Sequence, residues 1–126
     1  MSEYTVKTID DMATIHDGLV KLAGAELGVE SFGIQVFDFP PDFGHYPEHD
    51  HSQDGQEEVY VVLRGSADIE LDGERVPIAT GSIVRVESGC RRKLHPGPDG
   101  LRVVAIGGTP GKNYERPRDF ELAAAS

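Results

Sequence analysis

Between residues 57 and 106 the chain is a series of short runs rich in β-branched residues, separated by turn-forming residues. The runs predict strands at 57 to 64, 66 to 71, 74 to 78, 82 to 87, 91 to 95 and 101 to 106. The separators are Gly65, Asp72-Gly73, Thr80-Gly81 and residues 97 to 100, and Asp72-Gly73 is a good hairpin signal. Many short strands at this spacing favour an all-β fold, an antiparallel barrel or jelly roll.

The residues before this region predict a few further elements. They are a strand at 5 to 9, a helical turn at 10 to 15 and a short helix at 19 to 27. Gly28 stands where a helix C-cap glycine belongs. Another strand, marked by Phe32 and Phe39, ends at Pro40-Pro41, since proline cannot continue a central ladder.

Size and charge limit the classes of protein to which the chain can belong. A chain of 126 residues normally forms one domain. With 22 acidic and 12 basic residues the net charge is −10, which repels phosphate backbones and anionic lipids. No apolar run approaches the roughly 20 residues that span a bilayer, residues 1 to 7 lack a signal-peptide core, and Cys90 has no second cysteine to pair with. We therefore expect a soluble, cytoplasmic protein that binds neither nucleic acid nor membrane.

The residues with the clearest metal-ligand pattern are His49, His51 and Glu58. In an extended segment both imidazoles point to one face, with backbones about 7 Å apart. Glu58 begins a strand that ends at Gly65, so a second strand can add a carboxylate. Two histidines and one acid suit Fe(II), Zn(II) or Mn(II).

These residues resemble the first motif of the cupin superfamily, which reads His-x-His, three or four residues, Glu, six residues, Gly. The interval from Glu58 to Gly65 matches. Six residues separate His51 from Glu58, so the resemblance implies a loop about two residues longer than usual. Glu57 would be the ligand if the strand register slipped, but Gly65 favours Glu58.

The second cupin motif resembles the segment from Gly81 to Pro96, with Gly89 also in place. Three positions depart from the motif. Glu87 stands in place of a proline, Arg92 in place of the fourth ligand histidine, and Pro96 in place of an asparagine. The resemblance implies a single cupin domain over residues 1 to 126, an antiparallel cupin or jelly-roll β-barrel with its core at about 31 to 107 and a short N-terminal helix. It also implies a homodimer, because cupins often pair.

Arg92 leaves several arrangements open. A guanidinium about 5 Å from a divalent cation is repelled by roughly 6 to 7 kcal/mol at an effective dielectric of 20. Arg92 can swing aside from a three-ligand metal, or replace the metal and pair with Glu58. It can also lie just outside the direct ligands of the metal and bind the carboxylate of a substrate. The plainer interpretation is a solvent-facing arginine in the basic run 91 to 93.

The expected function is binding or chemistry of a small molecule at a divalent metal, which would be Fe, Zn, Mn or Ni. Tyr60 lies on the same face of its strand as Glu58, so we expect it to line the cavity and bind the substrate. We expect Arg92 to bind the substrate as well. His45 shares the odd parity of the two histidines and is an alternative source of the missing ligand. By resemblance, an enzyme would be a dioxygenase, isomerase or decarboxylase, and fold does not choose among these. The alternative is a metal-free binding or sensor module with Arg92 in the metal position.

Overall fold

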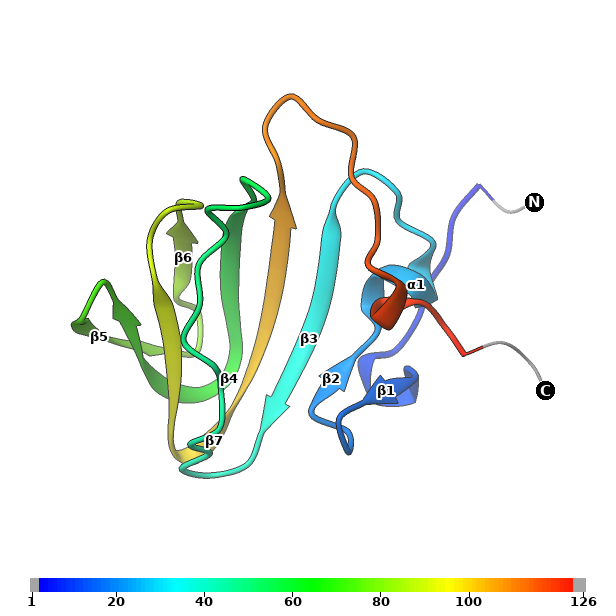
Figure 1. Cartoon of the computed structure of the whole chain (residues 1–126). Helices are drawn as coiled ribbons and strands as arrows, with labels where there is room; N and C mark the ends of the chain where they lie inside the picture. The colour runs from blue at the N-terminus through cyan, green and yellow to red at the C-terminus, as the bar shows by residue number, and fades with distance from the viewer. Residues whose placement is uncertain (1–2, 124–126) are drawn as a thin grey trace.

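Two long antiparallel strands, β4 (Glu57–Leu71) and β7 (Arg92–Gly108), form the centre of the fold in the computed structural model, which describes residues 3 to 123 (Figure 1). They pair along most of their length and bend together where Gly65 lies opposite Leu101. Gly65 has a φ of +85°, and a Cβ there would lie 2.0 Å from the carbonyl oxygen of Gly100. Glycine is required at this bend because a side chain would collide with backbone.

The bend explains why the predicted strands were correct in position but wrong in number. The runs 57 to 64 and 66 to 71 form one strand, and 91 to 95 and 101 to 106 form another. Glycine marks a bend within a strand as readily as a break between two strands.

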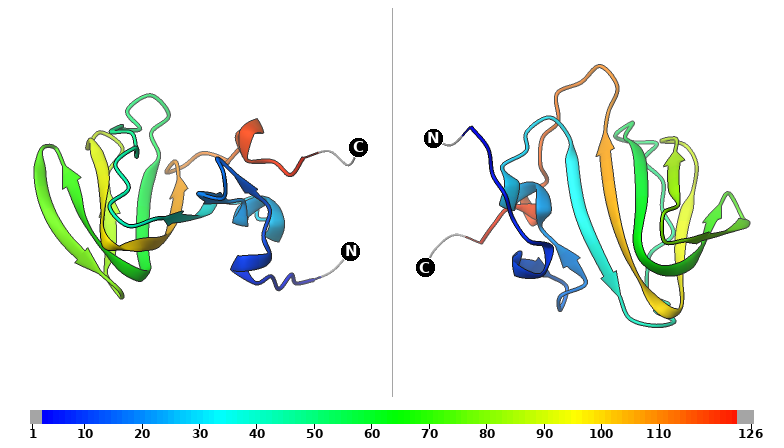
Figure 2. Two further views of the ribbon diagram at one scale, coloured as in Figure 1. Left: turned by 90° about the horizontal axis from the view of Figure 1, so that it is seen from below. Right: turned by 180° about the vertical axis from the view of Figure 1, so that it is seen from behind.

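The other strands extend the sheet on both sides of this pair. They are β1 (Thr14–Ile15), β2 (Val20–Lys21), β3 (Gly33–Phe39), β5 (Glu74–Ala79) and β6 (Ile83–Val86). The order is β1-β2-β3-β7-β4-β5, and β6 pairs with β4. The predicted antiparallel all-β fold with one short helix is confirmed. Over residues 3 to 123 the strand pairing of this curved sheet does not close into a complete ring (Figure 2).

The N-terminal region differs most from expectation. The helix α1 (Ala23–Leu27) is shorter than predicted because β2, within the predicted helix, pairs with β3. Gly28 does end this helix in the left-handed conformation, with a φ of +76°. No strand forms at 5 to 9, and the predicted turn is a 3-10 helix at Ile9–Asp11. A second 3-10 helix lies at Arg118–Phe120.

Burial along β4 shows how the bend directs side chains. Before it the buried residues are the even-numbered Tyr60 and Val62, and after it they are the odd-numbered Ala67 and Ile69. The register shift around Gly65 causes this change of parity. Glu58 shares the face of Tyr60 and Val62, so its carboxylate points into the concave side of the sheet.

No helix in the described part of the chain is long and apolar enough to cross a membrane.

An ion-pair cluster joins β3, β7 and the N-terminal segment. Arg102 donates to Asp38 from Nε at 2.7 Å and Nη2 at 2.8 Å, and also to Asp10. Lys21 lies 3.5 Å from the same Asp38 carboxylate. Burial raises the pKa of Asp38, but hydrogen bonds and charge from Arg102 outweigh it and leave that pKa below its usual value.

We expect Asp38→Asn to lower the free energy of unfolding by about 2 kcal/mol at pH 7. A lowered folded-state pKa stabilises the protein above the unfolded pKa of about 3.9, and this contribution is lost as pH falls through the folded value. The difference from wild type should therefore shrink near pH 3. Urea unfolding at both pH values measures it, with the exposed Asp99→Asn as control. A pH-independent difference would show that the ion pair is not the cause.

Candidate metal-binding site

Glu58 is held by strands on both sides. It pairs with Val86 of β6 and with Gly107 of β7. Its neighbour Glu57 points outward and forms an ion pair of 3.2 Å with Arg85. The register therefore places Glu58, and not Glu57, on the concave face, as the interval to Gly65 predicted.

The segment carrying His49 and His51 lies against the start of β7. His49 and Arg92 exchange backbone hydrogen bonds of 3.0 and 2.8 Å, and the amide of His51 donates to the carbonyl of Ser88 at 2.8 Å. These bonds keep the segment extended, and the two imidazole centroids are 5.2 Å apart. Both rings point to the same side, as the two-residue period predicted.

The predicted convergence of His49, His51 and Glu58 is confirmed. One potential ligand atom from each lies within 4.8 Å of the others. Nε2 of His51 is 3.2 Å from Oε1 of Glu58. Ligand atoms bound at about 2.0 to 2.2 Å in a tetrahedral site are separated by roughly 3.4 Å. The three residues therefore fit one divalent ion with only small side-chain adjustments.

The outer nitrogen of each imidazole is already engaged. Nδ1 of His49 donates to the carbonyl of Pro47 at 3.0 Å, and a carbonyl can only accept. Nδ1 of His51 lies 3.1 Å from Oδ2 of Asp54. Metal-binding histidines usually make such a bond to a carbonyl or carboxylate, which leaves Nε2 free for the metal. This role of Asp54 was not predicted from the sequence. Its position three residues after His51 could have indicated a contact between the two side chains.

Arg92 is among the most deeply buried side chains in the described chain, with 0% exposure, so the solvent-facing interpretation is wrong. Its Nη1 lies 3.3 Å from Oε1 of Glu58, and its Nη2 donates to the carbonyl of Glu87 at 2.8 Å. Arg92 therefore pairs with Glu58 from behind the site. It does not line the cavity in this structure, and its expected role in substrate binding stays a prediction.

Two tyrosines complete the support of Glu58. The Tyr60 hydroxyl donates to Oε1 of Glu58 at 2.9 Å and lies 3.2 Å from the hydroxyl of Tyr46. Burial raises the pKa of both tyrosines, so they stay protonated. Tyr46 lines the cavity, whereas Tyr60 does not. Substrate binding by Tyr60 therefore also stays a prediction.

The charges of the site are coupled. Burial raises the pKa of Glu58, but the hydrogen bond from His51, with further contributions from Tyr60 and Arg92, holds it below its usual value. The hydrogen bond to Glu58 raises the pKa of His51 despite partial burial, and Asp54 adds to this. Glu58 is therefore an ionised carboxylate at neutral pH, as a metal ligand must be.

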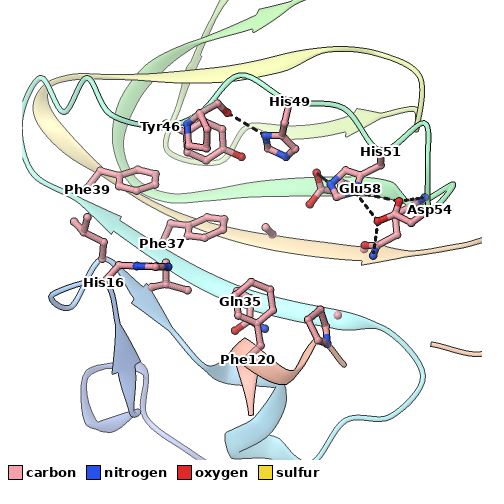
Figure 3. Close-up of a pocket in the computed structure, with 18 of the residues that line it drawn as sticks. His16, Gln35, Phe37, Phe39, Tyr46, His49, His51, Asp54, Glu58 and Phe120 are labelled. Carbon is pink, nitrogen blue, oxygen red and sulfur yellow. Dashed lines mark hydrogen bonds and ion pairs between the residues drawn. The ribbon is translucent and has the colours of Figure 1, made fainter. Parts of the chain in front are cut away.

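The three residues lie at one end of a cavity of about 640 Å³ (Figure 3). Aromatic side chains of β3 and of the following loop form much of its wall. His45 also lines the cavity but is not part of the three-residue group, and its ring packs edge-on against Phe43 at 5.6 Å. His45 therefore does not replace the fourth ligand in this arrangement.

Similarity to known proteins covers the region that carries this site. Residues 35 to 107 match the cupin domain family. An uncharacterised protein of Streptomyces coelicolor, SCO3923, is 38% identical over 55 residues, which cover 44% of this chain and 52% of that relative. The chain thus spans about half the length of that curated relative.

Solved structures show the same fold at lower sequence identity. A cupin protein from Bacteroides fragilis is 19% identical and has a TM-score of 0.72, with both chains covered completely. The plu4264 protein from Photorhabdus luminescens is 18% identical and has a TM-score of 0.65, over 87% of this chain and 90% of that one. The match to the domain family covers more than half of the sequence, and the curved sheet agrees with it. The chain belongs to the cupin family.

Proposed function

We propose that this cupin binds one divalent metal ion, Fe, Zn, Mn or Ni, through His49, His51 and Glu58, and a small molecule beside it. The observation that carries the proposal is the convergence of three ligand atoms within 4.8 Å of one another. Both histidines also have their outer nitrogens engaged. These bonds orient both rings for a metal, and metal binding would release the proton through which Nε2 of His51 contacts Glu58.

A bound metal would supply Lewis acidity or oxygen activation, with open positions for substrate and solvent. The protein's own groups hold and orient the ligands. Asp54 fixes the ring of His51, while Tyr60 and Arg92 fix the carboxylate of Glu58. Binding by three ligands with an arginine nearby should be weaker than in a four-ligand site.

A metal-free binding module is the second candidate, and the position of Arg92 favours it. The guanidinium lies 3.3 Å from Glu58, so it already balances the charge that a metal would otherwise balance. The two candidates differ in one measurable respect. Only the first requires saturable binding of one divalent ion per chain.

Asp54→Asn tests the proposal through a residue that would not itself touch the metal. Loss of the carboxylate that orients His51 should weaken Zn(II) binding by about 10- to 100-fold and leave the stoichiometry at one. Calorimetric titration of metal-free protein measures both quantities. Asp50→Asn is a matched control in the same loop, because the Asp50 carboxylate accepts bonds from Ser52 instead. Equal affinities in wild type and both variants would contradict the assigned role of Asp54.

A further inference from the structure

One face of β3 forms the cavity wall opposite the metal-binding residues. Gly33, Gln35, Phe37 and Phe39 alternate along the strand and all line the cavity. Val36 on the other face packs into a separate core cluster with Met12. Figure 3 shows Gln35 and Phe37 across the cavity from His49 and His51.

Three phenylalanine rings on this side lie nearly parallel. The rings of Phe37 and Phe39 are 5.6 Å apart with an angle of 10° between their planes. Those of Phe39 and Phe43 are 5.0 Å apart at 3°. Phe39 is buried, whereas Phe37 and Phe43 keep part of their surface free beside the cavity. A flat apolar ligand can pack on such a wall and remove it from water.

Gln35 adds a polar group to this apolar wall. Its side chain is in the cavity lining, yet the residue is only 6% exposed. Its Oε1 atom is buried, and no group in the described residues donates to it. A buried acceptor without a donor is costly. A ligand with a hydroxyl or amino hydrogen would gain a bond here once the Gln35 amide turns toward the cavity.

The C-terminal segment closes the cavity from a further side. Tyr114, Pro117 and Phe120 line it. Arg116, between them, donates to the backbone carbonyls of Gly24 and Val29, which ties this segment to α1 and the turn after it. Aromatic side chains from two distant parts of the chain therefore border the same cavity.

We propose that the cavity takes a flat aromatic molecule with two polar ends. One end is an anionic oxygen group directed at the metal-binding residues, and the other is a hydroxyl or amino group that donates to Gln35. The first half of this inference rests on the proposed function, whereas the aromatic wall and Gln35 do not. The cavity, at about 640 Å³, is within the range of small-molecule sites.

The test uses 2-naphthoate and its ring-hydroxylated isomers as probes. The chain contains no tryptophan, so probe fluorescence can be followed with little background from the protein. We expect the best hydroxylated isomer to bind about fivefold more tightly than 2-naphthoate, as one added hydrogen bond allows. Gln35→Leu should remove this preference without weakening 2-naphthoate. Phe37→Leu should weaken both probes by about tenfold.

Decahydronaphthalene-2-carboxylate is the matched non-aromatic acid, and we expect it to bind more weakly than 2-naphthoate. The inference is overturned if this acid binds as tightly, if no hydroxylated isomer is preferred, or if Gln35→Leu keeps the preference. Melting curves of each variant confirm folding. Zn(II) titration without any organic probe tests the metal site separately. Zn(II) binding with no naphthoate preference refutes this inference alone, and a Gln35-dependent preference without Zn(II) binding refutes only the metal proposal.

Discussion

Replacing both His49 and His51 by alanine should abolish the rise in melting temperature that a divalent metal gives to the wild-type protein. A ligand that binds only the folded state stabilises it by about 2.7 kcal/mol at a free concentration 100 times its dissociation constant. For a domain of this size that corresponds to a shift of several degrees. With one carboxylate left from the group of three, the variant should show no shift.

Thermal unfolding with and without Zn(II), Mn(II), Fe(II) or Ni(II) measures this effect. The control is His95→Ala, because His95 bonds to Glu70 at 2.8 Å and lies outside the site. It should keep the full metal-dependent shift. A shift that survives in the double variant would place the metal elsewhere on the protein.

Gly65→Ala should have the largest effect on stability, a loss of more than about 4 kcal/mol, or failure to fold. Two costs combine at this position. The backbone has a φ of +85°, and the new Cβ would lie 2.0 Å from the Gly100 carbonyl oxygen, so β4 and β7 would have to separate. Both long strands depend on this contact for their common bend.

Gly73→Ala separates the two costs. Gly73 has a φ of +88°, but a Cβ there would meet no atom within 4 Å. The stability lost by Gly73→Ala should therefore be limited to the backbone strain, which is about 1 to 2 kcal/mol. Chemical denaturation of the three proteins gives the comparison. Similar losses in the two variants would show that the close approach of Gly65 to Gly100 is not what fixes the bend.

Local patterns predicted the convergence of His49, His51 and Glu58 because this geometry depends on short intervals. The two-residue spacing of His49 and His51 determines that their rings share a face. That relation follows from the period of an extended chain. The choice of Glu58 over Glu57 came from the resemblance, because the interval from Glu58 to Gly65 matches the cupin motif. The structure adds that Gly65 lies at a bend of β4.

The features that sequence did not predict depend on distant partners. Residues 20 and 21 read as part of a helix but pair with β3. Arg92 stands in a basic run that suggests a surface, yet its pairing with Leu71 and His49 carries its side chain into the interior. The polar residue Gln35 belongs to the cavity only because β3 faces the site. Such effects appear only after the sheet has been assembled.

The most direct test of the central claim is the metal content of the protein, purified without a histidine tag after growth in metal-supplemented medium. Elemental analysis should find about one equivalent of Fe, Zn, Mn or Ni per chain in the wild type. Glu58→Gln, which removes the charged ligand but keeps its size, should hold far less. A wild-type protein that contains no metal and binds none on titration would contradict the account, as would an equal metal content in Glu58→Gln.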